Sequence, residues 1–133
     1  MQIKSSKTLV DEALKEVETL EPLKAKELLE KEGCTLIDIR DIRELWNEGA
    51  VDGALHISRG MLEFWLDSKS PYYKKEKFGD VNKKIVLFCA AGSRSALSAK
   101  TLKDMGFNNV AHISGGFGAM KANGFNIVDK EKE

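Results

Sequence analysis

The sequence predicts an α/β fold in which a central parallel sheet carries helices on both faces, with an amphipathic helix added at the N-terminal end. Residues 85–88 form an apolar run without alternation, which is typical of a central strand buried on both faces. Strand-like stretches alternate with helical periodicity along the chain, as they do around parallel sheets. A length of 133 residues suits one compact domain.

The first predicted helix is amphipathic and covers residues 6–17. Lysine and glutamate occupy one side, and the other side carries the apolar residues Leu9, Val10, Ala13, Leu14 and Val17. We expect residues 1–20 to form a helical extension that packs against a domain of residues 21–133. A dimer interface is the alternative use of this helix.

Strands and helices then alternate, beginning with a short strand over residues 17–20. Pro22 begins the next helix and Gly33 ends it, because proline suits the first turn and glycine a left-handed stop. A strand follows at residues 35–39. The spacing of Asp41 and Glu44 predicts a capping box at the start of another helix.

The second half of the chain continues this alternation. The expected elements are a strand at 55–57, a helix at 60–67, a surface connection at 68–83, the central strand, a helix ending at Gly106, a strand at 109–113 and a helix at 118–123.

Cys89 directly follows the central strand and is a candidate nucleophile. It opens a loop of the small residues Ala90, Ala91, Gly92 and Ser93, which Arg94 closes at the start of a helix. Amide N–H groups of such a loop converge on the sulfur, and the helix end and the arginine add positive potential. These surroundings favour the reactive thiolate. The alternative is an inert buried cysteine that ends a core strand.

The loop resembles the active-site loop of the rhodanese-like sulfurtransferases, written C-x-x-G-x-R, with Cys89, Gly92 and Arg94 in the matching places. Other segments resemble the family's motifs in the family's order: the Asp-x-Arg strand at 36–40, the stretch at 49–57 and the Gly-Gly element at 115–120. The resemblance implies a single rhodanese-like domain beyond residue 20.

Three residues depart from the family's pattern. Ala50 stands where histidine is common, Met120 where tryptophan is common, and Ala90 where many thiosulfate-using members carry a basic residue. The first two concern packing. The third weakens the case for thiosulfate as the natural donor.

The resemblance implies sulfur transfer from a donor such as thiosulfate, through a persulfide on Cys89, to a thiol or cyanide. Residues 90–94 would bind the donor, and the reaction requires no metal or organic cofactor. A cysteine-based phosphatase or arsenate reductase is one alternative, although the loops of those enzymes are longer by one residue. A noncatalytic sulfur-carrier or binding module is another, although domains of this fold without activity commonly lack the cysteine.

Other polar side chains are candidates by position only. Asp38 and Arg59 lie at or just beyond the carboxyl ends of predicted strands and would reach the rim of the pocket. Asp38 and Arg40 are chiefly structural in the resembling family, and Arg40 could pair with Glu44 or another acid. The two histidines, His56 and His112, are expected to be structural.

Composition limits the partners and the compartment. Lys plus Arg and Asp plus Glu each number 21, so no overall field draws the chain to nucleic acid or to a membrane. The expected partners are a small anionic sulfur donor and a thiol acceptor, with a sulfur-accepting protein as a further candidate. No apolar stretch suits a membrane span or signal core, so we expect the cytoplasm.

The two cysteines are expected to remain free thiols. Cys34 precedes a strand and Cys89 ends one, so they lie at opposite edges of a parallel sheet. A disulfide tolerates only about 6 Å between Cα atoms.

Overall fold

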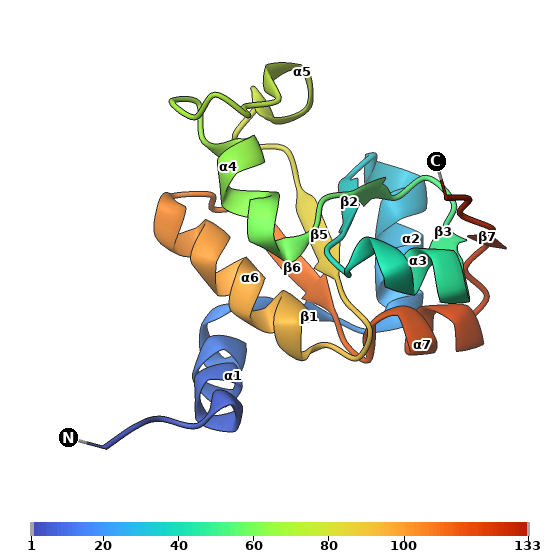
Figure 1. The fold of residues 1–133 in the computed structure, drawn as a ribbon, viewed down its shortest axis with the longest axis horizontal. Coiled ribbons are helices and arrows are strands. Elements are labelled where there is room, and N and C mark those ends of the chain that lie inside the picture. The colour runs from blue at the N-terminus through green and yellow to red at the C-terminus, as the bar shows by residue number, and fades with distance from the viewer. Residues whose placement is uncertain (1, 133) are drawn as a thin grey trace.

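The computed structural model describes residues 2–132 and has a five-stranded parallel sheet at its centre (Figure 1). The strand order is β1-β6-β5-β2-β4, and every neighbouring pair is parallel. The strands are β1 Glu18–Leu20, β2 Thr35–Asp38, β4 Leu55–His56, β5 Ile85–Phe88 and β6 Val110–Ile113. The predicted α/β fold with a central parallel sheet is therefore confirmed.

Helices cover both faces of the sheet (Figure 1). They are α1 Ser6–Glu16, α2 Pro22–Glu32, α3 Ile42–Glu48, α4 Leu62–Leu66, α5 Lys75–Phe78, α6 Ser93–Met105 and α7 Gly116–Ala122, and a 3-10 turn, η1, spans Arg59–Met61. One apolar cluster joins α4 and α6 to the sheet, and a second joins α2 and α7 to its other face.

The helix ends follow the local chemistry of the sequence. Pro22 begins α2, and Gly33 follows it with a φ of 62°. Asp41 and Glu44 form the predicted capping box at the start of α3. Gly106 ends α6 with a φ of 110°, which glycine adopts without a steric penalty.

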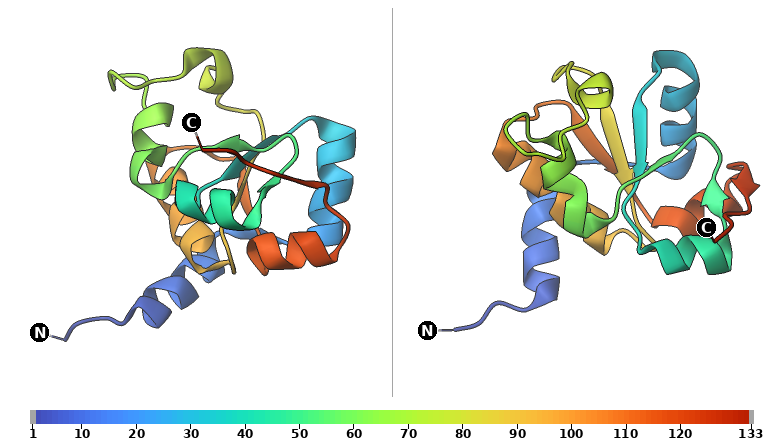
Figure 2. Two further views of the ribbon diagram at one scale, coloured as in Figure 1. Left: turned by 45° about the vertical axis from the view of Figure 1, so that its right-hand side comes forward. Right: turned by 45° about the horizontal axis from the view of Figure 1, so that its top comes forward.

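The N-terminal helix α1 packs against α6, as predicted (Figure 2). Its Ala13 is fully buried, whereas Leu9 and Leu14 remain partly open to solvent. The strand that follows, β1, pairs with β6 and forms one edge of the central sheet. Residues 6–20 thus contribute both a helix and an edge strand to the molecule.

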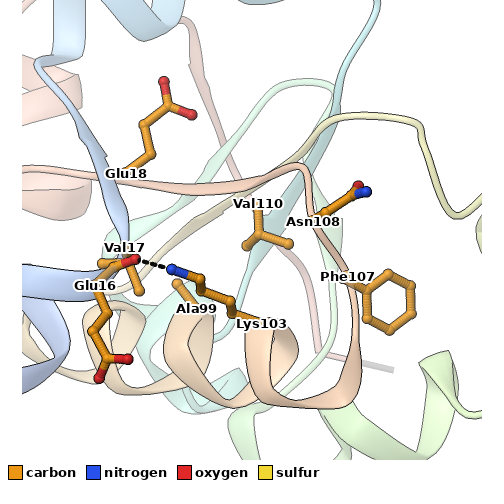
Figure 3. Close-up of a pocket in the computed structure, with 8 residues that line it drawn as sticks. All are labelled: Glu16, Val17, Glu18, Ala99, Lys103, Phe107, Asn108 and Val110. Carbon is orange, nitrogen blue, oxygen red and sulfur yellow. Dashed lines mark hydrogen bonds between the residues drawn. The ribbon is translucent and has the colours of Figure 1, made fainter.

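A small cavity lies where α1 passes into β1 (Figure 3). Its volume is about 170 Å³, and Glu16, Val110 and the aliphatic stem of Lys103 are among its lining residues. The Lys103 Nζ atom donates a hydrogen bond to the carbonyl oxygen of Glu16 at 2.7 Å, which links α6 to the C-terminal end of α1. Cys89 does not line the cavity.

Three local features differ from the sequence-based expectation. The two-residue strands β3 (Ala50–Val51) and β7 (Ile127–Val128) pair antiparallel, and they are too short to give a periodic signal. The segment at 68–83, expected as a surface connection, contains α5 and buries Phe78. The last helix, α7, begins at Gly116 rather than at residue 118.

Candidate active site

Cys89 directly follows β5, at the carboxyl edge of the sheet, and opens the loop to α6. Figure 1 shows this loop between the end of β5 and the N-terminus of α6. The loop turns sharply because Gly92 adopts a φ of 113°, a conformation that other residues rarely adopt. The start of α7 supports the loop from the other side, since the Phe117 N–H donates to the Cys89 carbonyl at 2.8 Å.

Gly116 allows this close approach between α7 and the loop. A Cβ atom at Gly116 would lie 2.4 Å from the Cys89 carbonyl oxygen, a separation that real Cβ atoms essentially never show. The Gly-Gly element at 115–116 therefore forms the floor of the cysteine loop.

The sulfur of Cys89 is surrounded by hydrogen-bond donors. The backbone N–H groups of Gly92 and Ser95 donate to Sγ at 3.1 and 3.4 Å, and the Ser95 Oγ lies 3.5 Å from Sγ. Cys89 is only 1% exposed, and its burial acts to raise the pKa of the thiol. Hydrogen bonds from the Ser95 side chain and from loop amides outweigh burial, so the net pKa of Cys89 is lowered. The arrangement favours the thiolate.

Arg94 closes the loop but does not point freely into solvent. Its Nη1 and Nη2 atoms donate to the two carboxylate oxygens of Glu44, both at 2.9 Å. The same carboxylate accepts from the Asp41 N–H in the capping box, so one side chain connects α3 to the start of α6. The hydrogen bond from Arg94 is the main reason that the pKa of Glu44 is lowered.

Asp38 and Arg40 form a buried ion pair behind the loop. The guanidinium Nε and Nη2 donate to the Asp38 carboxylate at 2.8–3.1 Å, and Nη2 also donates to the Gly49 carbonyl at 2.9 Å. The Phe117 ring lies 3.9 Å from the guanidinium carbon. Glu44, named from the sequence as one acid that could pair with Arg40, instead binds Arg94. These contacts give Asp38 and Arg40 a structural role between β2, β3 and α7.

Arg59 is exposed at the start of η1, and its N–H donates to the Ile39 carbonyl. It lines an open cavity together with Leu97 and Lys100 of α6. Arg59 and the buried Asp38, the two residues placed at the rim from sequence, therefore occupy different environments.

Ser95 and His112 are site residues that the sequence analysis did not select. His112 is 1% exposed on β6, and its Nδ1 lies 2.9 Å from the Ser95 Oγ. Its Nε2 lies 2.9 Å from the Thr19 Oγ1 on β1. The sequence signal for Ser95 was its place directly after Arg94. His112 could be connected to Cys89 only through the sheet register, which sets it beside Leu87 and Thr19.

Cys34 and Cys89 are both free thiols, as predicted. Within residues 2–132, no group of three or more histidine, cysteine, aspartate or glutamate side chains is arranged to hold a metal ion. No helix in this part of the chain is long and apolar enough to cross a membrane.

A profile of the rhodanese-like domain matches residues 21–123. The chain belongs to this family. The family assignment made from the sequence is thereby confirmed.

Named relatives of this rhodanese-like domain include sulfurtransferases. The thiosulfate sulfurtransferase GlpE of Actinobacillus pleuropneumoniae is 31% identical over 108 residues, which cover 81% of this chain and 90% of that protein. The thiosulfate sulfurtransferase/rhodanese-like domain-containing protein 3 of Mus musculus is 31% identical over 96 residues, or 69% of this chain. The match spans 60% of the mouse protein's length.

Two solved structures are similar over almost the whole domain. A protein of unknown function from Rhodopseudomonas palustris, described as a possible tyrosine phosphatase, is 44% identical with a TM-score of 0.88. The match covers 96% of this chain and 97% of that one. The polysulfide-sulfur transferase homodimer of Wolinella succinogenes is 34% identical with a TM-score of 0.73, and coverage is 93% and 87%.

Proposed function

We propose that this rhodanese-like domain is a sulfurtransferase that carries sulfur as a persulfide on Cys89. The observation that carries the proposal is the set of donors around one buried sulfur: two backbone N–H groups and a serine hydroxyl within 3.5 Å of Sγ. This set stabilises a thiolate, which is the nucleophile that sulfur transfer needs.

In the first step, the Cys89 thiolate attacks the outer sulfur of the donor. With thiosulfate, a new S–S bond forms to Cys89, the S–S bond of the donor breaks, and sulfite leaves with the electron pair of that bond. The loop amides stabilise the negative charge of the donor and of the departing group. Arg94, whose terminal nitrogens are bound to Glu44, contributes through its positive charge and not through a fork of hydrogen bonds.

In the second step, an acceptor thiolate or cyanide attacks the outer sulfur of the persulfide. The S–S bond to Cys89 breaks, and its electron pair returns to Sγ, which regenerates the thiolate. The Gly92 and Ser95 amides bind Sγ before and after this step. The expected acceptor is a small thiol, and an acceptor cysteine on a partner protein fits the same chemistry. A reducing compartment such as the cytoplasm would keep both thiols of the chain free.

Phosphatase activity is the alternative hypothesis, since a structural relative is described as a possible tyrosine phosphatase. Two features of the site disfavour it. The loop from Cys89 to Arg94 is one residue shorter than the loops expected of cysteine phosphatases. In addition, both terminal nitrogens of Arg94 are bound to the carboxylate of Glu44, whereas a phosphoryl dianion needs such a fork of donors for its own oxygens.

The choice of donor depends on the loop residues at 90 and 91. Both are alanines, so these two positions add no positive charge for a dianion such as thiosulfate. One structural relative is a named polysulfide-sulfur transferase. We propose polysulfide as a second donor that deserves equal testing beside thiosulfate.

The test is the intact mass of the protein after incubation with thiosulfate or with polysulfide, followed by cyanide. We expect a gain of one sulfur atom that cyanide removes as thiocyanate. Cys89→Ser should show no gain, and Cys34→Ala is the matched control that should behave as the natural chain. Hydrolysis of p-nitrophenyl phosphate without any sulfur gain would instead support the phosphatase.

A further inference from the structure

Four side chains behind the cysteine loop form a continuous hydrogen-bonded chain through the interior. It runs from Cys89 Sγ to Ser95 Oγ at 3.5 Å and from Ser95 Oγ to His112 Nδ1 at 2.9 Å. It then passes from His112 Nε2 to Thr19 Oγ1, also at 2.9 Å. Cys89, Ser95 and His112 are each at most 1% exposed, so water does not compete for the contacts among these three side chains, whereas Thr19 at the far end is exposed.

The donors and acceptors around the Ser95 hydroxyl can be counted. The Ser95 hydroxyl has one proton, and its neighbours are Cys89 Sγ, His112 Nδ1 and the Gly92 carbonyl at 3.2 Å. When Cys89 is a thiolate, the sulfur and the carbonyl are both acceptors. If Nδ1 also lacked a proton, three acceptors would compete for a single donor.

His112 resolves this competition when its proton lies on Nδ1. Burial lowers the pKa of His112, which favours the neutral ring with one N–H. With that proton on Nδ1, the ring donates to Ser95 Oγ. The serine proton is then available to the charged sulfur, because the Gly92 carbonyl already accepts from the Ala96 N–H at 3.2 Å. The unprotonated Nε2 then accepts from the Thr19 hydroxyl, which satisfies every member of the chain.

We propose that His112 is a positioning residue for the nucleophile: by donating from Nδ1 to Ser95, it directs the serine hydroxyl to the Cys89 sulfur and stabilises the thiolate. The inference deepens the proposed function and relies on it for the biological role of the thiolate. The thiol proton goes to solvent when Cys89 ionises, and His112 stays neutral throughout.

Other charged groups near the loop do not take part in the hydrogen bonds that link Cys89, Ser95, His112 and Thr19. Arg94 of α6, paired with Glu44 of α3, interacts electrostatically with Cys89 and with Asp38 at the end of β2. Asp38 is itself paired with Arg40. None of these four groups hydrogen-bonds to His112 or to the Ser95 hydroxyl, so substitutions at His112 leave them in place.

The test is the rate of Cys89 alkylation by iodoacetamide as a function of pH, in a Cys34→Ala background and without any sulfur donor. Ser95→Ala should lower the rate at pH 7 by about tenfold, because a hydrogen bond to the thiolate is lost. His112→Gln, which offers no donor near Nδ1, should lower it by about fivefold and move the midpoint upward. His112→Asn keeps an N–H near Nδ1 and should stay within about twofold of the natural rate.

A double-mutant cycle separates positioning from general support of the fold. If His112 acts through Ser95, then His112→Gln should have no further effect on the rate once Ser95→Ala is present. Equal effects of His112→Gln in both backgrounds would overturn the proposal, and so would an unchanged pH profile in the single variant.

A second measurement uses the natural chain and does not depend on how the variants fold. The ¹⁵N shifts of His112 should show a protonated Nδ1 and an unprotonated Nε2 above the Cys89 midpoint. The opposite tautomer would contradict the proposal. Neither measurement contains a sulfur donor. If the protein failed to transfer sulfur, the alkylation rates and the ¹⁵N shifts would therefore still test the role of His112.

Discussion

The two cysteines of this domain lie at opposite ends of two neighbouring strands, and the pKa values of their thiols are shifted in opposite directions. Cys34 precedes β2, and burial together with the nearby Glu32 raises the pKa of its thiol. Cys89 follows β5 and is more deeply buried, yet its pKa is lowered. The difference lies in the donors: hydrogen bonds from Ser95 and from the loop amides offset the effect of burial at Cys89. Burial alone therefore does not identify an inert thiol.

Removing each thiol in turn should give the largest difference in sulfurtransferase activity between two variants. Cys89→Ser should abolish persulfide formation, because the hydroxyl is far too weak an acid to replace the thiolate at neutral pH. Cys34→Ala should keep full turnover in a thiocyanate assay. Equal losses in the two variants would remove the distinction between the two sites.

The glycines beside the two cysteines provide a matched structural test. Gly33 and Gly116 both have positive φ, but a Cβ at Gly33 meets open space and one at Gly116 meets the Cys89 carbonyl at 2.4 Å. Gly33→Ala should therefore cost about 1 kcal/mol of unfolding free energy. Gly116→Ala should cost about 3 kcal/mol or more and disturb the loop. Urea denaturation of both variants measures this, and equal midpoints would contradict the proposed floor of the loop.

The loop arginine should matter for turnover more than for stability. Arg94→Ala removes the positive charge beside the sulfur and should lower kcat/KM for thiosulfate by on the order of 100-fold. Arg43→Ala is the control, since Arg43 forms a comparable ion pair with Asp41 on the exposed side of α3. A similar loss of kcat/KM in both variants would show that the effect is not specific to the site.

The smallest expected effect is a difference in pH dependence between single-thiol variants. Alkylation needs the thiolate, so each rate rises with pH through the pKa of its thiol. The midpoint for Cys89 should lie below the ordinary thiol value of 9.0, and that for Cys34 should lie above it. Iodoacetamide rates between pH 5 and 10 in Cys34→Ala and Cys89→Ser would show this, and a reversed order would refute the assignment of donors.

Local chemistry accounts for the parts of the fold that the sequence predicts well. The buried strand β5, the proline and glycine limits of α2, and the capping box of Asp41 and Glu44 each depend on residues within a few positions of one another. The cysteine loop is equally local, since six consecutive residues and the following helix define it.

The remaining features depend on contacts between distant segments. Glu44 and Arg94 are 50 positions apart, and Ser95 and His112 are 17 apart, so no periodic pattern connects them. The pairing of β3 with β7 likewise joins two-residue strands from different parts of the chain. Only the register of the folded sheet brings such partners together.

The Cys89 loop draws its support from residues that emerge from the ribosome at very different times. Thr19 and Glu44 are made before the cysteine, whereas His112 and Phe117 are made after it. A nascent chain that has extended just past Cys89 lacks the strand and the helix that enclose the loop. During synthesis, therefore, the full set of contacts around Cys89 forms only after β6 and α7 have docked.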